Sequence, residues 1–332
     1  MSTQVPRFLA GLVDDAAVFP PGSASLPDAL AAHRRHRASW YADLVGPLLV
    51  PASALPDLAR LLDASEQAAT GGGDHGSRSA GVDGNGSRPA GVDGNGSRPA
   101  GVDGNGSRPA TTGRLDVGVI GNVPLDHLGA ACAAADPRLR VRQVEAAVAR
   151  RGEDPLPGLA ELTALAAGHP ELDVYAEIPL AWGLMNALDR LAEQRSAGVR
   201  IAAKFRTGGL AAELFPTPGE LATVVCACRD RKLPFKLTAG LHHATRHLDP
   251  ETGFTHHGFV NVLAAVGAAA EGAGVKAVTE VLTRTDPRPL LQQVEPGRDE
   301  ARPLWVGFGS CSVQEPLTDL IRLGLVDGGW TR

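Results

Sequence analysis

Short apolar β-like runs alternate with helix-like runs along most of this chain, and this order limits the possible folds more than any other feature. The β-like runs cover residues 44–50, 115–120, 141–147, 173–178, 200–205, 234–239 and 304–308. The helix-like runs cover residues 56–69, 125–135, 157–167, 184–197, 218–230 and 315–323. Such alternation is typical of a parallel sheet whose strands are joined by crossover helices.

The number and spacing of these runs favour a closed barrel. A barrel of eight strand-helix units takes about 250 residues, so a chain of 332 residues has room for one barrel with extra segments. The eighth strand could be residues 12–18 or lie within residues 260–276, although the latter stretch is more typical of a helix. An open, doubly wound sheet is the alternative, but no Gly-x-Gly-x-x-Gly follows the first strand. We therefore predict an α/β fold, a (β/α)8 TIM-type barrel, with residues 1–332 forming a single domain.

A decapeptide repeat interrupts this pattern. The segment 76–85, Gly-Ser-Arg-Ser-Ala-Gly-Val-Asp-Gly-Asn, recurs almost unchanged from Gly86 and from Gly96. The repeat has one valine per ten residues and many Gly, Pro, Asn and Ser residues, so it buries too little apolar surface to offset the conformational entropy lost on folding. A calcium-binding roll would need more turns and more apolar positions. We predict a low-complexity, disordered insertion at 70–112 within the barrel.

The overall composition restricts the class of partner. Hydrophobic residues make up 43% of the chain and charged residues 21%, which is ordinary for a protein with a full core and excludes disorder of the whole chain. A formal net charge of -5 gives no general attraction to nucleic acid or anionic lipid. No apolar run approaches the roughly 18 residues of a membrane span, and the N-terminus lacks the order of a signal peptide. We expect a cytoplasmic protein that acts on a small molecule and binds neither nucleic acid nor membranes; a homo-oligomer is left open.

Charged side chains recur on one phase of four consecutive predicted strands. Successive side chains of a strand point to opposite faces, so an apolar phase facing the helices can be separated from a polar phase facing the barrel interior. The polar phase carries Glu145, Glu177, Lys204, Arg206, Lys236 and Thr238. These residues lie toward the C-terminal ends of their strands, where barrel active sites are built. In the alternative interpretation these charges only neutralise one another inside the barrel, but the pattern favours a role in an active site.

Two lysines on neighbouring strands suggest covalent chemistry with a carbonyl group. A lysine amine becomes a nucleophile when desolvation or a second cation lowers its pKa, and it can then form a Schiff base. We expect Lys236 to lower the pKa of Lys204, or the reverse. Glu145 or Glu177 would carry protons, and Arg206 would hold a carboxylate or phosphate of the substrate.

The same two strands resemble a known family. Residues 204–209, Lys-Phe-Arg-Thr-Gly-Gly, are followed by a Pro-rich helix start and then by residues 235–241, Phe-Lys-Leu-Thr-Ala-Gly-Leu. They are similar to the lysine strands of deoxyribose-phosphate aldolase and related Schiff-base (class I) aldolases, and the likeness covers residues 199–241 only. The resemblance implies a (β/α) barrel in which Lys204 forms the Schiff base and Lys236 tunes it.

The chain departs from the family pattern in two places. The second lysine strand runs into Leu241-His242-His243, where the family has Gly-Gly-Ile. No clear equivalent of the family's aspartate occurs on an earlier strand, although Glu145 or Glu177 could substitute for it. The resemblance therefore supports the fold and an electrophile-binding lysine more than any particular aldol reaction.

Histidines gather after the second lysine strand and suggest a different chemistry. Five of the ten histidines lie within sixteen residues, from His242 to His257. Imidazole rings at a barrel mouth can bind a divalent metal, and His242 and His243 with Glu177 form the candidate metal set. His242 could equally act as a general acid or base. We expect no cofactor, with a divalent metal such as zinc as the alternative.

Further candidates for substrate binding lie where loops gather at the same end of the predicted barrel. They are Thr238, His243, Arg246, Gly309, Ser310 and Ser312, together with Arg206. The loop 307–312 ends the last strand and leads into a helix, so its backbone N–H groups could hold a phosphate or carboxylate. A tight turn without a ligand is the alternative.

The sequence as a whole favours an enzyme, a lyase of the Schiff-base aldolase type that acts on a small anionic carbonyl compound. The catalytic candidates are Lys204, Lys236, Glu145, Glu177 and His242. Two alternatives remain: a metal-dependent hydrolase or decarboxylase, and a non-catalytic barrel that binds a metabolite.

Overall fold

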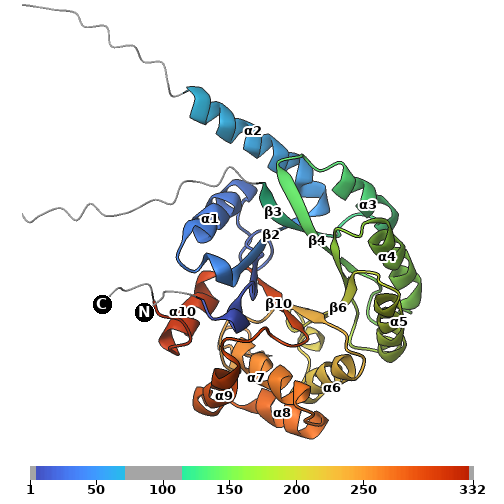
Figure 1. The fold of residues 1–332 in the computed structure, drawn as a ribbon, viewed down its shortest axis with the longest axis vertical. Helices are drawn as coiled ribbons and strands as arrows, with labels where there is room; N and C mark the ends of the chain where they lie inside the picture. Colours follow the sequence, from blue (N-terminus) through green and yellow to red (C-terminus); the bar gives the residue numbers. More distant parts are fainter. Residues whose placement is uncertain (1–4, 72–113, 329–332) are drawn as a thin grey trace, which may run out of the picture.

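The computed structural model describes residues 5–71 and 114–328, and these form a closed barrel of eight parallel strands (Figure 1). Around the barrel the strand order is β1-β10-β7-β6-β5-β4-β3-β2. The strands are β1 (Val13–Asp15), β2 (Val45–Pro51), β3 (Leu115–Ile120), β4 (Leu139–Ala147), β5 (Asp173–Glu177), β6 (Ile201–Arg206), β7 (Phe235–Thr238) and β10 (Trp305–Ser310). The predicted (β/α)8 TIM-type fold is confirmed.

Helices surround the barrel and cover its outer face (Figure 1). They are α1 (Leu26–Ala38), α2 (Leu55–Gly71), α3 (Leu125–Ala133), α4 (Leu156–Gly168), α5 (Leu184–Ser196), α6 (Pro218–Asp230), α7 (Phe259–Ala270), α8 (Val275–Thr283), α9 (Pro287–Val294) and α10 (Gln314–Arg322). Short 3-10 turns are η1 (Arg7–Leu9), η2 (Ala42–Leu44), η3 (Ala52–Ala54), η4 (Ala212–Leu214) and η5 (Glu295–Gly297). None of the helices in the described ranges has both the length and the hydrophobicity of a membrane span.

Local sequence explains where the best-defined helices begin. Thr217 caps α6 in a capping box, because its side chain accepts from the Glu220 N–H while the Glu220 carboxylate accepts from the Thr217 N–H. Ser25 caps α1 by accepting from the backbone N–H of Asp28, and a proline lies in the first turn of each of these two helices. These caps provide acceptors for backbone N–H groups that would otherwise be unpaired at the two helix starts.

The eighth strand of the barrel is β1, within the first of the two segments proposed for it. β1 pairs with β2 on one side and with β10 on the other, so the sheet has no free edge and the open-sheet alternative is wrong. The second proposal, residues 260–276, is also wrong, because α7 and the start of α8 occupy that stretch. The predicted insertion at 70–112 lies almost entirely outside the described residues.

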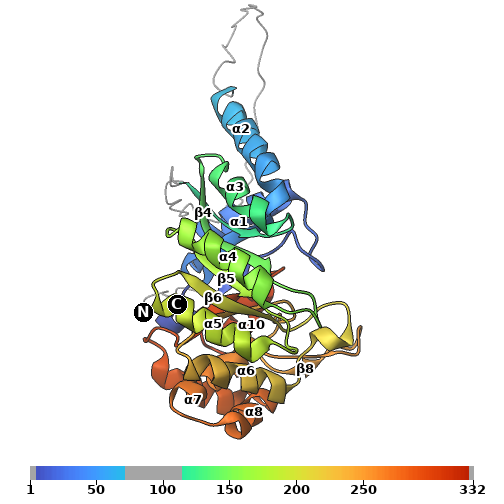
Figure 2. The same cartoon turned by 90° about the vertical axis from the view of Figure 1, so that its right-hand side faces the viewer.

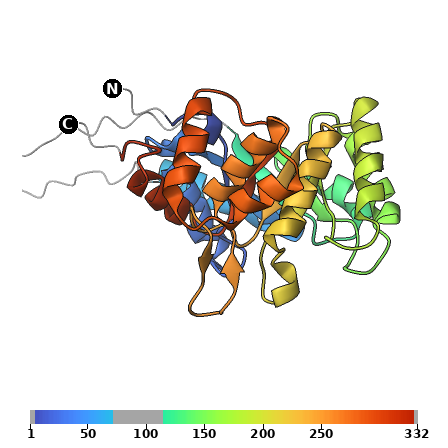
Figure 3. The ribbon, with the colours of Figure 1, turned by 90° about the horizontal axis from the view of Figure 1, so that it is seen from below.

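A small antiparallel hairpin interrupts the regular order between β7 and α7. It consists of β8 (His247–Leu248) and β9 (Thr255–His256) and stands out from the body of the barrel (Figures 2 and 3). The sequence did not predict it. Because it follows the carboxyl end of β7, the hairpin lies at the end of the barrel where βα loops gather.

The hydrophobic core lies between the strands and the surrounding helices. The apolar phase of the lysine strands is fully buried there, with Ala203, Phe205, Phe235 and Leu237 all inaccessible to solvent. Phe205 and Phe235 contact each other across the two strands, at 6.1 Å between ring centroids. Because successive side chains of a strand point to opposite faces, the charged side chains of these two strands point to the inside of the barrel.

Candidate functional site

The inside of the barrel holds a continuous chain of ion pairs. Lys204 Nζ lies 2.8 Å from Glu145 Oε2 and 2.8 Å from Glu177 Oε2. Lys236 Nζ lies between Glu145 Oε1 and Asp14 Oδ2. Lys204, Lys236 and Glu145 are only 3%, 1% and 1% exposed. The prediction that these side chains aim at one shared space is confirmed.

Strand register explains the meeting of the charges. Glu177 of β5 is paired with Lys204 of β6, which in turn is paired with Lys236 of β7. Three charged residues therefore stand at one level of the barrel, on strands that are neighbours in space. Arg206 comes two residues after Lys204, on the same face, and its Nε and Nη2 lie 3.1 Å from Glu177 Oε1.

Asp14 is the member of this network that the sequence did not predict. It is 4% exposed, contacts Lys236, and accepts from Gln143 Nε2 at 2.7 Å. The same amide donates to Glu145 at 2.9 Å, so Gln143 ties the two carboxylates together. A side chain at Gly118 would come within 2.8 Å of that amide, so glycine there leaves room for it. The signal for Asp14 was a charged residue inside an apolar run near the N-terminus.

The lysine pKa values differ from those expected. Burial alone would lower the pKa of Lys204, but the charges of Glu145 and Glu177 outweigh it and the pKa is raised. Burial is likewise outweighed at Lys236, where Asp14 and Glu145 raise the pKa of the amine. The prediction that one lysine lowers the pKa of the other is wrong, because carboxylates separate the two ammonium groups.

The carboxylates of the network do not behave alike. Burial would raise the pKa of Glu145, but Lys204 and Lys236 lower it to about 2. At Glu177 burial is also outweighed, by Lys204 and Arg206, and the pKa is lowered. At Asp14 burial prevails, and nearby Glu145 adds to it, so the pKa is raised despite Lys236. Glu145 is thus the most firmly ionised carboxylate inside the barrel.

A pocket of about 240 Å³ opens beside this network, at the carboxyl ends of β4, β5 and β6. Its lining includes Glu177, Arg206 and Arg151, together with the loop residues Phe215 and Pro216. Glu177 belongs both to the pocket and to the buried network, so it connects the Lys204 amine to the pocket. Arg151 and the loop residues were not among the predicted site residues, because they lie in loops after the strands, where side-chain alternation gives no information on direction.

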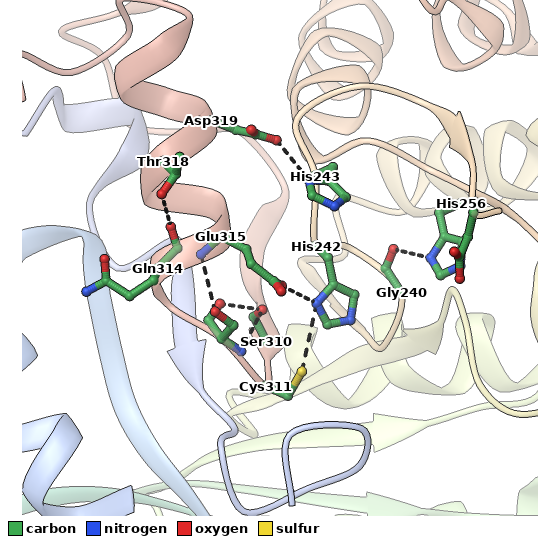
Figure 4. Close-up of polar contacts among 12 residues, drawn as sticks. Gly240, His242, His243, His256, Ser310, Cys311, Gln314, Glu315, Thr318 and Asp319 are labelled. Atoms are coloured by element: carbon green, nitrogen blue, oxygen red, sulfur yellow. Dashed lines mark hydrogen bonds and ion pairs between the residues drawn. The ribbon is translucent and has the colours of Figure 1, made fainter. Parts of the chain in front are cut away.

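The predicted loop residues of the last strand lie apart from this pocket. Gly309 is paired with Thr238 of β7 and with Asp14 of β1. Ser310 donates to the Ser312 carbonyl at 2.8 Å and accepts from the Ser312 N–H, and Ser312 Oγ accepts from the Glu315 N–H (Figure 4). These internal bonds form a tight turn, and an anion site at the backbone of this loop stays a prediction of the sequence.

The predicted metal set is not assembled. His242 Nδ1 lies 2.9 Å from Glu315 and 3.8 Å from Cys311 Sγ, while His243 Nδ1 lies 3.2 Å from Asp319 (Figure 4). Both rings are thus held by α10, whereas Glu177 is held by Lys204 and Arg206. Within residues 5–71 and 114–328, no three His, Cys, Asp or Glu side chains are arranged to hold a metal ion. The metal-dependent alternative stays a prediction of the sequence.

Arg246, the last predicted substrate-binding residue, lies at the base of the β8–β9 hairpin. Its backbone N–H donates to Asn261 Oδ1 at 2.9 Å. Asn261 is fully buried and donates to the carbonyls of Val281 and Arg284, so it anchors the hairpin base to α8. The guanidinium group of Arg246 takes no part in the ion pairs of the barrel interior.

Comparison with protein-family models, curated proteins and solved structures finds no match to this chain. The barrel fold therefore stands on the structure alone. The likeness of residues 199–241 to Schiff-base aldolases remains a similarity of short motifs.

Proposed function

We propose that this chain is an enzyme that forms a Schiff base between Lys204 and a small anionic carbonyl compound. The observation that carries the proposal is the position of the Lys204 amine, 2.8 Å from a glutamate that also lines a pocket. The pocket lies at the C-terminal end of the barrel, where enzymes of this fold place their active sites. An amine next to a carboxylate that can exchange protons with it is what imine formation requires.

The pocket is suited to an anionic substrate. Arg206 and Arg151 both line it, and the Arg206 side chain is 42% exposed. A guanidinium group can bind a carboxylate or phosphate through two parallel hydrogen bonds. Three glutamates line the same pocket: Glu177 is paired with Lys204 and Arg206, Glu220 is engaged in the α6 capping box, and Glu213 is exposed. Arg206, which is partly exposed and adjoins Glu177, is the cation that we expect to bind the substrate anion.

Binding of this anion would also activate the amine. The raised pKa of Lys204 keeps its amine protonated, and Glu177 is held ionised by Lys204 and Arg206. An anion on Arg206 would weaken the stabilisation that Arg206 gives to the Glu177 carboxylate, so the pKa of Glu177 would rise toward that of Lys204. Imine formation uses the fraction of Lys204 that is a neutral amine, and in that fraction the proton lies on Glu177, the neighbouring carboxylate that lines the pocket.

The subsequent steps balance in atoms and charge. The neutral amine adds to the substrate carbonyl carbon, and the nitrogen passes its proton to the carbonyl oxygen to give a carbinolamine. Glu177 then returns its proton to the hydroxyl group, which leaves as water, and a protonated imine remains on Lys204. The ionised Glu177 beside the cationic imine restores the original charge pattern. Lys236 keeps Glu145 in place throughout.

Reductive trapping tests this proposal. With pyruvate as the probe and borohydride as the reductant, we expect a mass increase that peptide mapping places on Lys204. Lys204→Met should abolish this adduct, whereas Lys276→Met, at an exposed lysine of α8, should leave it unchanged. Failure to trap pyruvate or any other anionic carbonyl probe, or an adduct that persists in Lys204→Met, would contradict the proposal.

A non-catalytic barrel is the second candidate, and the charge balance of the network favours it. Asp14, Glu145 and Glu177 alternate with Lys236, Lys204 and Arg206, so buried charges are matched without a ligand. For that candidate, Lys204→Met should leave the affinity for a retained metabolite nearly unchanged. Under our proposal the same variant loses both the adduct and turnover.

A further inference from the structure

The pocket beside the ion-pair network has an apolar part that the proposed reaction does not use. Besides its charged residues, the pocket is lined by a group of apolar side chains, Ile178, Pro179, Leu180, Leu214, Phe215 and Pro216. Leu180, Leu214 and Phe215 are only partly buried, so some of their surface stays accessible to solvent. Ligand pockets are typically lined by such apolar groups, with a few polar groups that orient the ligand. The apolar part therefore has the composition of a surface that binds the unreactive portion of a substrate.

The apolar wall is held in place by the hairpin segment behind it. The Phe215 ring packs against Phe254 at 4.8 Å and edge-on against His256 at 4.9 Å, measured between ring centroids. His257 Nε2 donates to the Pro216 carbonyl at 2.7 Å. A wall that is already in place loses little conformational entropy when a ligand binds, so more of the contact energy contributes to affinity.

The two cations that would hold the reacting end of the substrate stand beside one carboxylate. Lys204 lies 2.8 Å from Glu177 Oε2, and Arg206 lies 3.1 Å from Glu177 Oε1. A carbonyl carbon at the Lys204 amine and an anion at Arg206 must therefore be close together in the substrate. A 2-oxo acid meets this requirement, because its carboxylate is attached directly to the carbonyl carbon.

The volume of the pocket exceeds what the smallest 2-oxo acid needs. An apolar cavity of about 150 Å³ holds benzene, which has as many non-hydrogen atoms as pyruvate. By the same proportion, a pocket of about 240 Å³ has room for pyruvate and about four further atoms. A substrate that fills the pocket thus carries a longer substituent than the methyl group of pyruvate.

The charges around the pocket disfavour a second anionic group on this substituent. Glu213 and Glu220 both line the pocket, and hydrogen bonds from Thr217 lower the pKa of the Glu220 carboxyl. The remaining cation, Arg151, already donates to the Glu213 carbonyl at 3.2 Å. A carboxylate on the substituent would face these two like charges, which selects against it. An apolar substituent meets no such penalty.

We propose that the substrate of this site is a 2-oxo acid with an apolar substituent of about four or five carbon atoms. Its carboxylate binds Arg206 and its carbonyl carbon faces Lys204. The substituent lies against Leu214 and Phe215 and displaces water from them, which is favourable for apolar surface. This inference names the substrate class of the site and rests on the proposed Schiff base.

Borohydride trapping with three probes tests the inference. 4-Methyl-2-oxopentanoate carries an apolar substituent, 2-oxoglutarate carries a second carboxylate at a similar total size, and pyruvate carries neither. We expect 4-methyl-2-oxopentanoate to half-saturate trapping at a concentration about tenfold or more below that of pyruvate, because each buried CH2 group contributes about fourfold in affinity. The half-saturating concentration of 2-oxoglutarate should be no lower than that of pyruvate.

Leu214→Asn makes the apolar wall polar at nearly constant size. It should raise the half-saturating concentration of 4-methyl-2-oxopentanoate about fivefold or more and change that of pyruvate less than about twofold. The pyruvate value also shows that the variant is folded. Leu210→Asn is the matched control, since Leu210 lies in the same loop and is 91% exposed. This control should leave both values unchanged.

Calorimetry with acids that lack the oxo group separates the two proposals. In the wild type, 4-methylpentanoate should bind about tenfold or more tightly than propanoate, although neither can form an imine. If pyruvate is trapped but neither experiment shows a preference for the apolar substituent, the inference is wrong and the Schiff-base proposal stands. If no oxo acid is trapped, the Schiff-base proposal is wrong, and equal binding of the two acids then overturns the inference as well. A preference for 2-oxoglutarate over 4-methyl-2-oxopentanoate, or an equal loss of both probes in Leu214→Asn, also overturns it.

Discussion

At the scale of single residues, Glu145 holds both lysines of the barrel. Its Oε2 pairs with Lys204 and its Oε1 with Lys236, and Gln143 donates to the same carboxylate. Removing its charge would leave two buried ammonium groups with one carboxylate each. A buried charge without compensation is far more costly than the pair was favourable.

Glu145→Gln should therefore destabilise the protein by about 3–5 kcal/mol, measured as the free energy of unfolding in urea. Glu193→Gln provides the matched control, since Glu193 pairs with Arg190 at 2.6 Å and both side chains are 59% exposed. An exposed pair contributes about 1 kcal/mol or less. Similar losses in the two variants would contradict the importance of the buried network.

The charge of the probe should decide how fast Lys204 reacts. Pyruvate should form the trapped adduct at neutral pH about tenfold or more faster than acetone, because each unit by which the anion raises the pKa of Glu177 shifts the proton equilibrium tenfold. Arg206→Gln should remove this preference, and because it also removes a cation that lowers the pKa of Glu177, its reaction with acetone should be no slower than that of the wild type. An equal rate for the two probes in the wild type would count against activation through Arg206.

At the scale of secondary-structure elements, β1 and β2 close the barrel through a tight contact. A side chain at Gly46, near the start of β2, would come within 1.9 Å of Asp14 Oδ1. Asp14 cannot easily move away, because it is buried and held by Lys236 and Gln143. The absence of a side chain at this position is thus part of how the network is built.

Gly46→Ala should lower the free energy of unfolding by about 1–3 kcal/mol, as overpacking of a filled interior does. Gly267→Ala in α7 is the matched control, because a side chain there meets no atom within 4 Å. In a helix interior that change should stabilise by about 0.5–1 kcal/mol. Both values come from chemical denaturation, and a neutral Gly46→Ala would show that Asp14 adapts freely.

The strands were predictable from sequence where they are long enough to show a pattern. β3 begins and ends where its apolar run does, and alternation along β6 correctly predicts that Lys204 and Arg206 share the inward face. β1 has only three residues, two of them adjacent aspartates, so no phase could be assigned. In the structure Asp14 points to Lys236, whereas Asp15 points outward and pairs with His33 at 3.0 Å.

The site was predictable only as far as strand alternation reaches. Alternation gives the inward side chains of each strand, but it carries no information on loops. The hairpin strands have two residues each, too few to show an alternating pattern. Phe215 lies in the irregular loop after β6, so the sequence did not predict its contact with His256. The pKa of Lys204 also depends on distances to Glu145 and Glu177, which a sequence does not contain.

At the scale of the whole molecule, the barrel interior departs from the usual pattern of its fold. Barrel interiors are normally filled by branched apolar residues, whereas here a chain of ion pairs occupies part of the interior and the apolar core lies between the strands and the helices. Stability then depends on the ionisation of groups at the centre, so the molecule as a whole should respond to pH through them.

Acid should remove the contribution of Glu145 to stability. Its pKa is lowered from the ordinary value of 4.5 to about 2 in the folded state, so its contribution is full above the unfolded value and is lost as the pH falls toward about 2. The difference in free energy of unfolding between the wild type and Glu145→Gln should therefore shrink steadily between about pH 5 and about pH 2. The raised pKa of Asp14 acts in the opposite direction, and because Glu145 contributes to that rise, the effect is smaller in Glu145→Gln and only part of it cancels in the difference. Urea denaturation across this range measures the effect, and a difference independent of pH would mean that the Glu145 carboxylate gains nothing from the two lysines.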